Sequence, residues 1–150
     1  MTVAALLQHK GSEVASVRPD DTIGTVVRVL TERSIGAAVV LDAAGQPVGI
    51  VSERDIVHAL AAKGMATQAV TAGELMTRTL KTATPNTTVS EAMGMMTFGR
   101  FRHLPVIDNG VLVGLVSIGD VVRAKLRQQE AEMDGLRAHV AGSAYVSGAD

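Results

Sequence analysis

The apolar residues of the chain follow a pattern that occurs twice. In the first half, four of them have the i, i+3, i+4, i+7 spacing of a helix with one buried face; they are Ile23, Val26, Val27 and Leu30. Two apolar runs follow, 37–41 and 47–51, and each has the length of a buried strand. The pattern then predicts a helix from Asp55 to about Lys63, which Gly64 ends.

The same order of elements returns in the second half. The helical spacing is repeated by Val89, Ala92, Met93 and Met96. Two strands are expected at 103–107 and 111–116, joined at Asn109-Gly110, a pair typical of a tight hairpin turn. A helix is expected from Asp120, and short strands at 14–17 and 80–83 open the two units.

The repeat therefore predicts two units with the order strand–helix–strand–strand–helix. We assign residues 1–66 to the first unit and 67–130 to the second, with small and polar residues linking them at 64–72. Residues 131–150 are then a helical extension and tail.

A strand that leads into a Ser-x-x-Asp step is the clearest shared segment. Gly49-Ile50-Val51-Ser52-Glu53-Arg54-Asp55 returns 65 positions later as Gly114-Leu115-Val116-Ser117-Ile118-Gly119-Asp120. A serine with an acid three residues on is typical of a helix start, where such a cap contributes about 1 kcal/mol. The same carboxylate is also suited to accept hydrogen bonds from ribose hydroxyls, beside a helix N-terminus that favours phosphate. The two roles are compatible, because they use opposite sides of the turn.

Composition removes several classes of function. The chain is 47% hydrophobic but only 2% aromatic, it has no cysteine, and its net charge is −1. There is no basic stripe for nucleic acid, no thiolate for a metal, and no apolar run long enough to span a membrane. The four histidines are scattered, and no nucleophile–base set or phosphate-binding loop is present. We therefore predict no catalytic residues, no metal site, no nucleic-acid or membrane partner, and a cytoplasmic protein.

The doubled motifs resemble those of a known family. Pro-x-x-Thr at 19–22 and 85–88, with the doubled Gly-φ-Val-Ser-x-x-Asp, is similar to a tandem pair of cystathionine-β-synthase (CBS) domains, a stand-alone Bateman module. The resemblance covers roughly residues 1–130. It implies an α+β fold in which two β-α-β-β-α units pack with pseudo-twofold symmetry around ligand clefts.

The resemblance also implies a ligand and its binding residues. The ligand would be an adenine nucleotide such as AMP, ADP or ATP, bound for regulation, with no cofactor required. Carboxylates would hold the ribose, hydroxyls would line the cleft, aliphatic residues would flank adenine, and basic residues would contact phosphate. The residues at the matching positions are Thr22, Ala38, Val39, Ser52, Arg54, Asp55, Thr88, Arg102, His103, Leu104, Pro105, Ser117 and Asp120.

The two units carry unequal charge at these positions. Arg54 corresponds to Gly119, and Arg102-His103 corresponds to Gly36-Ala37. We therefore expect the two clefts to differ in their affinity for phosphate. Arg54 and His103 also have simpler interpretations, as a solvated side chain and a hydrogen-bonded strand histidine.

The resemblance implies one function and leaves an alternative open. The first is a non-enzymatic regulatory module that senses cellular energy by binding an adenine nucleotide, forms a homodimer, and acts on a protein target that the sequence does not identify. The alternative is a structural or dimerisation module with degenerate ligand sites.

The residues after Val122 continue a helical pattern. A thin heptad-like seam is formed by Leu126, Met133, Leu136 and Val140. It suits either packing on the chain's own domain or a dimer mate, or a coiled coil with a partner. Residues 142–150 are expected to be a frayed tail.

Overall fold

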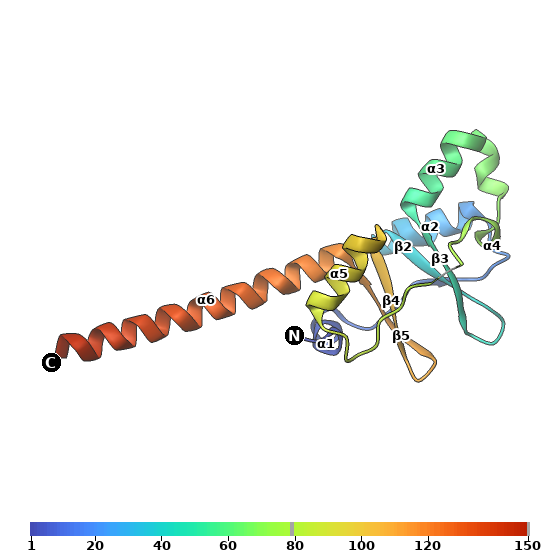
Figure 1. Cartoon of the computed structure of the whole chain (residues 1–150). Coiled ribbons are helices and arrows are strands. Elements are labelled where there is room, and N and C mark those ends of the chain that lie inside the picture. Colours follow the sequence, from blue (N-terminus) through green and yellow to red (C-terminus); the bar gives the residue numbers. More distant parts are fainter. Residues whose placement is uncertain (79, 150) are drawn as a thin grey trace.

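Two small sheets flanked by helices, and one long projecting helix, make up the molecule (Figure 1). The computed structural model describes residues 1–78 and 80–149. The first sheet has the order β1 (Ser16–Val17), β2 (Ala37–Leu41), β3 (Pro47–Ser52); β1 is parallel to β2, and β2 is antiparallel to β3. The second sheet pairs β4 (His103–Asp108) with β5 (Val111–Ser117) in antiparallel fashion.

The helices follow the predicted order. They are α1 (Val3–Lys10), α2 (Ile23–Arg33), α3 (Glu53–Lys63), the 3₁₀ helix η1 (Gly64–Ala69), α4 (Ala72–Leu75), α5 (Val89–Gly99) and α6 (Ile118–Ala149). The α+β class and the two repeated units are confirmed. The turn between β4 and β5 has positive φ at both Asn109 and Gly110, 50° and 80°, as the Asn-Gly pair predicts.

Two local predictions are wrong, for the strand at 80–83 and the tail from 142, and the expected linker contains a short helix. The strand expected at 80–83 is reduced to a single parallel bridge between Ala83 and Val106, because the chain turns at once: Thr84 N–H donates to Thr87 Oγ1 at 3.0 Å and a proline follows. The expected linker begins with η1, which the Thr67 hydroxyl anchors by donating to Ala59 C=O at 3.1 Å. The tail expected from residue 142 continues α6 as far as Ala149; Asp150 lies outside the described residues.

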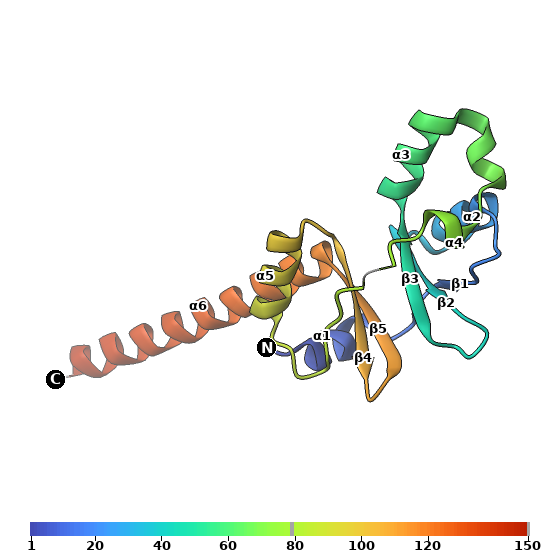
Figure 2. The same cartoon turned by 45° about the vertical axis from the view of Figure 1, so that its right-hand side comes forward.

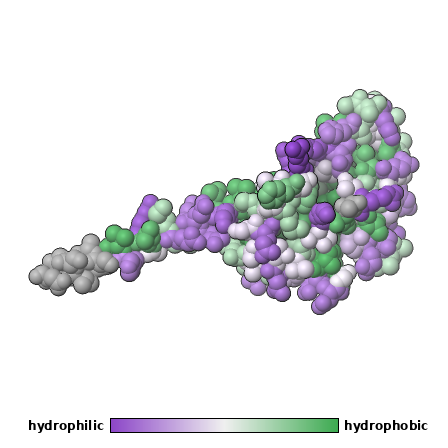
Figure 3. All heavy atoms as spheres, viewed as in Figure 1, coloured by the Kyte–Doolittle hydropathy of each residue, from purple (hydrophilic) through white to green (hydrophobic). Residues whose placement is uncertain are grey.

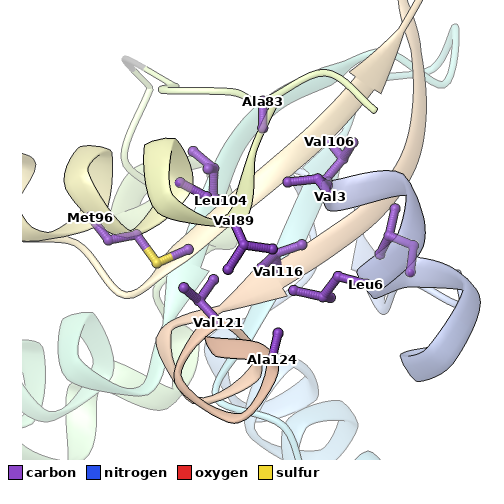
Figure 4. Packing of buried hydrophobic residues seen from close by; sticks show 12 residues of the cluster. Val3, Leu6, Ala83, Val89, Met96, Leu104, Val106, Val116, Val121 and Ala124 are labelled. Atoms are coloured by element: carbon purple, nitrogen blue, oxygen red, sulfur yellow. The ribbon is translucent and has the colours of Figure 1, made fainter. Parts of the chain in front are cut away.

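The two short helices pack across the repeat. Val3, Leu6 and Leu7 of α1 lie in the core of the second half, as Figure 4 shows for Val3 and Leu6. Ala72 of α4 lies in the core of the first half. Figures 1 and 2 place α1 beside the β4–β5 sheet and α4 beside β3. We assigned the N-terminal helix to the first unit (1–66), but its apolar side chains belong to the core of the second half.

A glycine in each sheet makes room for this packing. A Cβ on Gly114 of β5 would come within 2.7 Å of both δ-methyl groups of Leu7 on α1. Gly49 of β3 lies against Met76, which follows α4, in the same way. Real Cβ atoms do not approach other atoms so closely. Each short helix, or the residue after it, therefore packs against its sheet at a position where only glycine, with no side chain, leaves enough room.

Candidate functional site

A pocket of about 410 Å³ lies where the start of α3 faces the loop between α5 and β4. Its size falls within the range of about 300–1,000 Å³ that is usual for small-molecule sites. It is lined from both halves of the chain by Ile50, Ser52, Glu53, Arg54, Asp55, Thr77, Leu80, Lys81, Gly99, Arg100, Phe101, Arg102, His103 and Pro105.

The turn that begins α3 fixes the Asp55 carboxylate on the wall of this pocket. Asp55 Oδ2 accepts from the backbone N–H of Ser52 at 2.8 Å and from its hydroxyl at 2.9 Å. Asp55 N–H donates in return to Ser52 Oγ at 3.3 Å, which completes a capping box. No hydrogen bond among the described residues uses Asp55 Oδ1. The Ser-x-x-Asp step therefore caps the helix with one oxygen, and the other has no hydrogen-bond partner among the described residues.

Among the charged side chains of the pocket wall, cations outnumber acids. Arg54, Lys81, Arg100 and Arg102 line it, and all four are exposed to solvent. Among the described residues, the acids on the wall are Glu53 and Asp55. A concave surface with excess charge of one sign attracts ligands of the opposite sign, and arginine pairs with phosphate through two parallel hydrogen bonds. The pocket is therefore suited to an anionic group near the α3 N-terminus.

The corresponding carboxylate of the second half, Asp120, is closed off by the protein itself. Its Oδ2 accepts from Lys10 Nζ at 2.5 Å and from Ser117 N–H at 2.8 Å. Its Oδ1 accepts from an Arg123 guanidinium nitrogen at 2.9 Å. Burial opposes ionisation of Asp120, but hydrogen bonds from Lys10 and Ser117 outweigh it and lower the pKa of this carboxyl below 3.8. Both oxygens are thus occupied, and the side chain is only 8% exposed.

His103 lies at the junction of the two halves. A Cβ on Gly36 would come within 3.2 Å of His103 Nε2, so the ring packs directly against the first unit. Burial, and next the charge of Lys10, lower the pKa of His103 below 6.5, although Glu53 and Asp120 act in the opposite direction. The imidazole is therefore mainly neutral at pH 7. It offers the pocket a hydrogen bond rather than a charge.

Six of the predicted site residues line the pocket, and seven do not. The six are Ser52, Arg54, Asp55, Arg102, His103 and Pro105. Thr22 and Thr88 are the N-caps of α2 and α5. Ala38, Val39 and Leu104 are completely buried, so their side chains belong to the core. Ser117 and Asp120 form the cap that Lys10 closes.

The repeat did not point to three cations that matter for this arrangement. Lys81 lies on the connection between the halves, and Arg100 is the left-handed C-cap of α5, with φ 57°. Neither belongs to a repeated motif, although the basic run 100–103 was a signal for the second. Lys10 reaches Asp120 from 110 positions away in the chain, and no local pattern predicts that contact.

The fold and these motifs agree with the sequence comparisons. The family model for the CBS domain matches residues 10–62 and 72–127, and the chain belongs to this family. It is similar to the mitochondrial CBS domain-containing protein CBSX3 of Arabidopsis thaliana, with 35% identity over 149 residues, which cover 94% of this chain and 72% of the relative.

Solved structures show the same architecture. The CBS-domain containing protein ATU1752 from Agrobacterium tumefaciens has 44% identity and a TM-score of 0.81, over 83% of this chain and 99% of that one. The CBS domain protein PAE2072 from Pyrobaculum aerophilum, complexed with AMP, has 29% identity and a TM-score of 0.72, over 80% of this chain and 89% of that one. The CBS domain pair of protein MJ0100, in complex with 5′-methylthioadenosine and S-adenosyl-L-methionine, has 25% identity and a TM-score of 0.76, over 85% and 98%.

Among the described residues, no group of three or more His, Cys, Asp or Glu side chains converges as a metal ion would require. In the same part of the chain, no helix combines the length and the apolar character needed to cross a bilayer.

Proposed function

We propose that this chain is a non-enzymatic regulatory module that binds one phosphorylated adenosine compound, such as AMP, ADP or ATP, in the pocket between its two units. One observation carries the proposal: an unused oxygen of Asp55 and four cationic side chains line the same pocket. A nucleotide needs both, because its ribose donates hydrogen bonds and its phosphate carries negative charge.

The pocket residues have distinct roles in this proposal. Asp55 Oδ1 accepts hydrogen bonds from ribose hydroxyls, and each such charged bond contributes about 1.5–3 kcal/mol. Arg54, Arg100 and Arg102 hold the phosphate, with Lys81 beside them. Ile50 and Pro105 offer apolar surface for the base. The related pairs that hold AMP or S-adenosyl-L-methionine support an adenosyl ligand, and the excess of cations favours AMP over the sulfonium compound.

The second cleft has little capacity for ligand in this proposal. Lys10 and Arg123 already occupy both oxygens of Asp120. A ribose would have to displace an internal ion pair before it could bind. We therefore expect one nucleotide for each chain, on the Asp55 side.

Calorimetric titration of protein that has been unfolded and refolded to remove carried ligand tests the proposal. AMP, ADP, ATP, adenosine and S-adenosylmethionine are compared. Asp55→Asn should weaken AMP binding at least about tenfold, since one lost charged hydrogen bond exceeds 1.4 kcal/mol. Asp20→Asn is the control, because Asp20 is exposed and outside the pocket, and it should leave the affinity unchanged.

A second variant separates the phosphate from the nucleoside. Arg102→Gln should weaken the binding of AMP and ATP more than the binding of adenosine, because adenosine has no phosphate for Arg102 to contact. If no adenosyl compound binds to the refolded protein, the proposal fails and a structural or dimerisation module with degenerate sites takes its place. Energy sensing additionally requires that AMP and ATP bind with different affinities, which the same titrations measure.

A further inference from the structure

Between residues 129 and 140, α6 buries no side chain that would explain why this part of the chain is helical. Every described side chain from 129 to 140 is exposed to solvent, and in Figure 1 this part of α6 projects away from both sheets. Helices in water are stabilised mainly by burying an apolar face. The segment also extends beyond residue 127, where the match to the CBS family ends.

An apolar seam runs along this helix with a seven-residue repeat. Leu126, Met133 and Val140 occupy the a positions, and Val122 and Leu136 occupy d positions, with Gln129 at the d position between them. The five apolar side chains are each 43–57% exposed. Figure 3 shows hydrophobic residues on the surface of the projecting helix, between hydrophilic stretches. Apolar residues at a and d are the contact positions of a two-stranded coiled coil.

The rest of the molecule leaves this seam open. α6 packs on its own domain through Val121 and Ala124, both completely buried, and Lys125 Nζ donates to Ser90 Oγ at 2.9 Å. Val121 is at a c position and Ala124 at an f position, on the side of the helix opposite to a and d. A second helix can therefore lie along the seam while the CBS units stay on the outside.

We infer that residues 122–140 of α6 pair with the same residues of a second copy of this chain, in a parallel, in-register coiled coil. The charges beside the seam select this occupant. In a parallel pair each g position faces the e′ position five residues later. Lys125 then meets Glu130 of the second copy, and Glu132 meets Arg137, so every such contact between charged residues is attractive. The lone polar seam residue, Gln129, meets its own copy, which favours this register.

Antiparallel pairing is less well matched. In the alignment that keeps all five apolar seam residues, e faces e′ and g faces g′. Glu130 and Glu132 then each meet their own copies, and like charges repel. A shift of one heptad towards the N-termini restores attraction but pairs Leu126 with Gln129, leaves Val140 outside the seam and brings Gly119 into it, and the opposite shift pairs Gln129 with Val140.

Disulfide cross-linking of the full-length chain tests the pairing, since the natural chain has no cysteine. Gln129→Cys should give a cross-linked dimer as the main species under mild oxidation. Arg127→Cys, at an exposed b position, should stay monomeric on the same gel. A dimer seen by ultracentrifugation without Gln129→Cys cross-linking would overturn the inference. So would cross-linking that appears only when Gln129→Cys is mixed with Leu126→Cys or Met133→Cys, because it would show antiparallel helices.

A charge reversal tests the stated contact between helices. In the Gln129→Cys chain, Glu132→Arg places two cations against each other and should reduce the cross-linked fraction several-fold. Adding Arg137→Glu should restore it, because the attraction returns with the signs exchanged. Equal yields from the single and double variants would refute the parallel arrangement of these charges.

Discussion

Replacing Lys10 with methionine removes the cation that closes Asp120 and keeps a side chain of similar length. Lys10 Nζ donates to Asp120 Oδ2 at 2.5 Å and to the Leu115 carbonyl at 2.6 Å. It thereby ties α1 to β5 and to the start of α6. The variant should therefore lower the free energy of unfolding without adding bulk.

The size of this loss follows from the environment of the pair. Hydrogen bonds to charged groups contribute about 1.5–3 kcal/mol each. Lys10 is 35% exposed and Asp120 is 8% exposed, so solvent screens the pair in part, and Asp120 keeps its bonds to Arg123 and Ser117. We expect a loss of about 2 kcal/mol, less than the roughly 3–5 kcal/mol of a buried charge left without a partner. For a chain of this length that lowers the melting temperature by about 4–8 °C.

Urea denaturation at pH 7 measures this loss. Arg123→Met is the matched control, because Arg123 is 64% exposed and its pair with Asp120 should contribute below about 1 kcal/mol. Combining Lys10→Met with Asp120→Asn gives a double-mutant cycle whose coupling should be about 1–2 kcal/mol. The reasoning is refuted if Lys10→Met costs no more than Arg123→Met, or costs the same when Asp120 is already Asn.

Three further predictions concern pH, strand packing and the core. Because the pKa of His103 is lowered, the unfolded chain binds more protons than the folded chain below pH 6.5, so the stability that neutral His103 contributes is complete above pH 6.5 and is lost as pH falls towards the folded pKa. Urea denaturation from pH 8 to 5 should show this loss, with a flatter profile for His103→Gln, and equal slopes for the two chains would contradict it. Gly114→Ala should destabilise the folded chain by about 1–3 kcal/mol, because the added methyl group forces β5 and Leu7 apart. Gly94→Ala in α5, where a Cβ meets nothing within 4 Å, should instead stabilise it by about 0.5–1 kcal/mol, and equal melting temperatures for the two variants would contradict this. Leu104→Ala should cost about 2–5 kcal/mol in urea denaturation, because the side chain is completely buried, and a cost below about 1 kcal/mol would show that its surroundings collapse readily.

The elements that the sequence predicted well are those set by local patterns. The i, i+3, i+4, i+7 spacing placed α2 and α5, and Asn109-Gly110 placed the hairpin. The Ser52 and Ser117 steps formed helix starts in the structure as well. Each of these signals involves residues within a few positions of one another, so the chain carries it without help from tertiary contacts.

The local predictions are wrong where distant contacts or flanking turns, rather than the local sequence pattern, decide the conformation of the segment. The apolar run at 80–83 has strand composition, but a turn begins at Thr84 and leaves one bridge. By contrast, the apolar run at 37–41 was correctly predicted as a strand, and its lack of alternation already indicates burial on both faces. Val39 and Val40 point to opposite faces and are both completely buried, which is the pattern of a strand covered on both sides.

The difference between the two Ser-x-x-Asp steps shows why the site needs the fold. In sequence the two carboxylates are equivalent, 65 positions apart, and both caps form. They differ in the structure for two reasons: Arg123, whose counterpart in the first unit is His58, pairs with Asp120, and α1 packs in the core of the second half and brings Lys10 onto the same carboxylate. The corresponding short helix of the first half, α4, has no lysine and is followed by the connection that carries Lys81 into the pocket beside Asp55. α1 therefore places Lys10 on the Asp120 carboxylate, whereas the connection after α4 places Lys81 in the open pocket that Asp55 lines. Of the two repeated carboxylates, Asp120 has both oxygens hydrogen-bonded within the protein, and Asp55 has one.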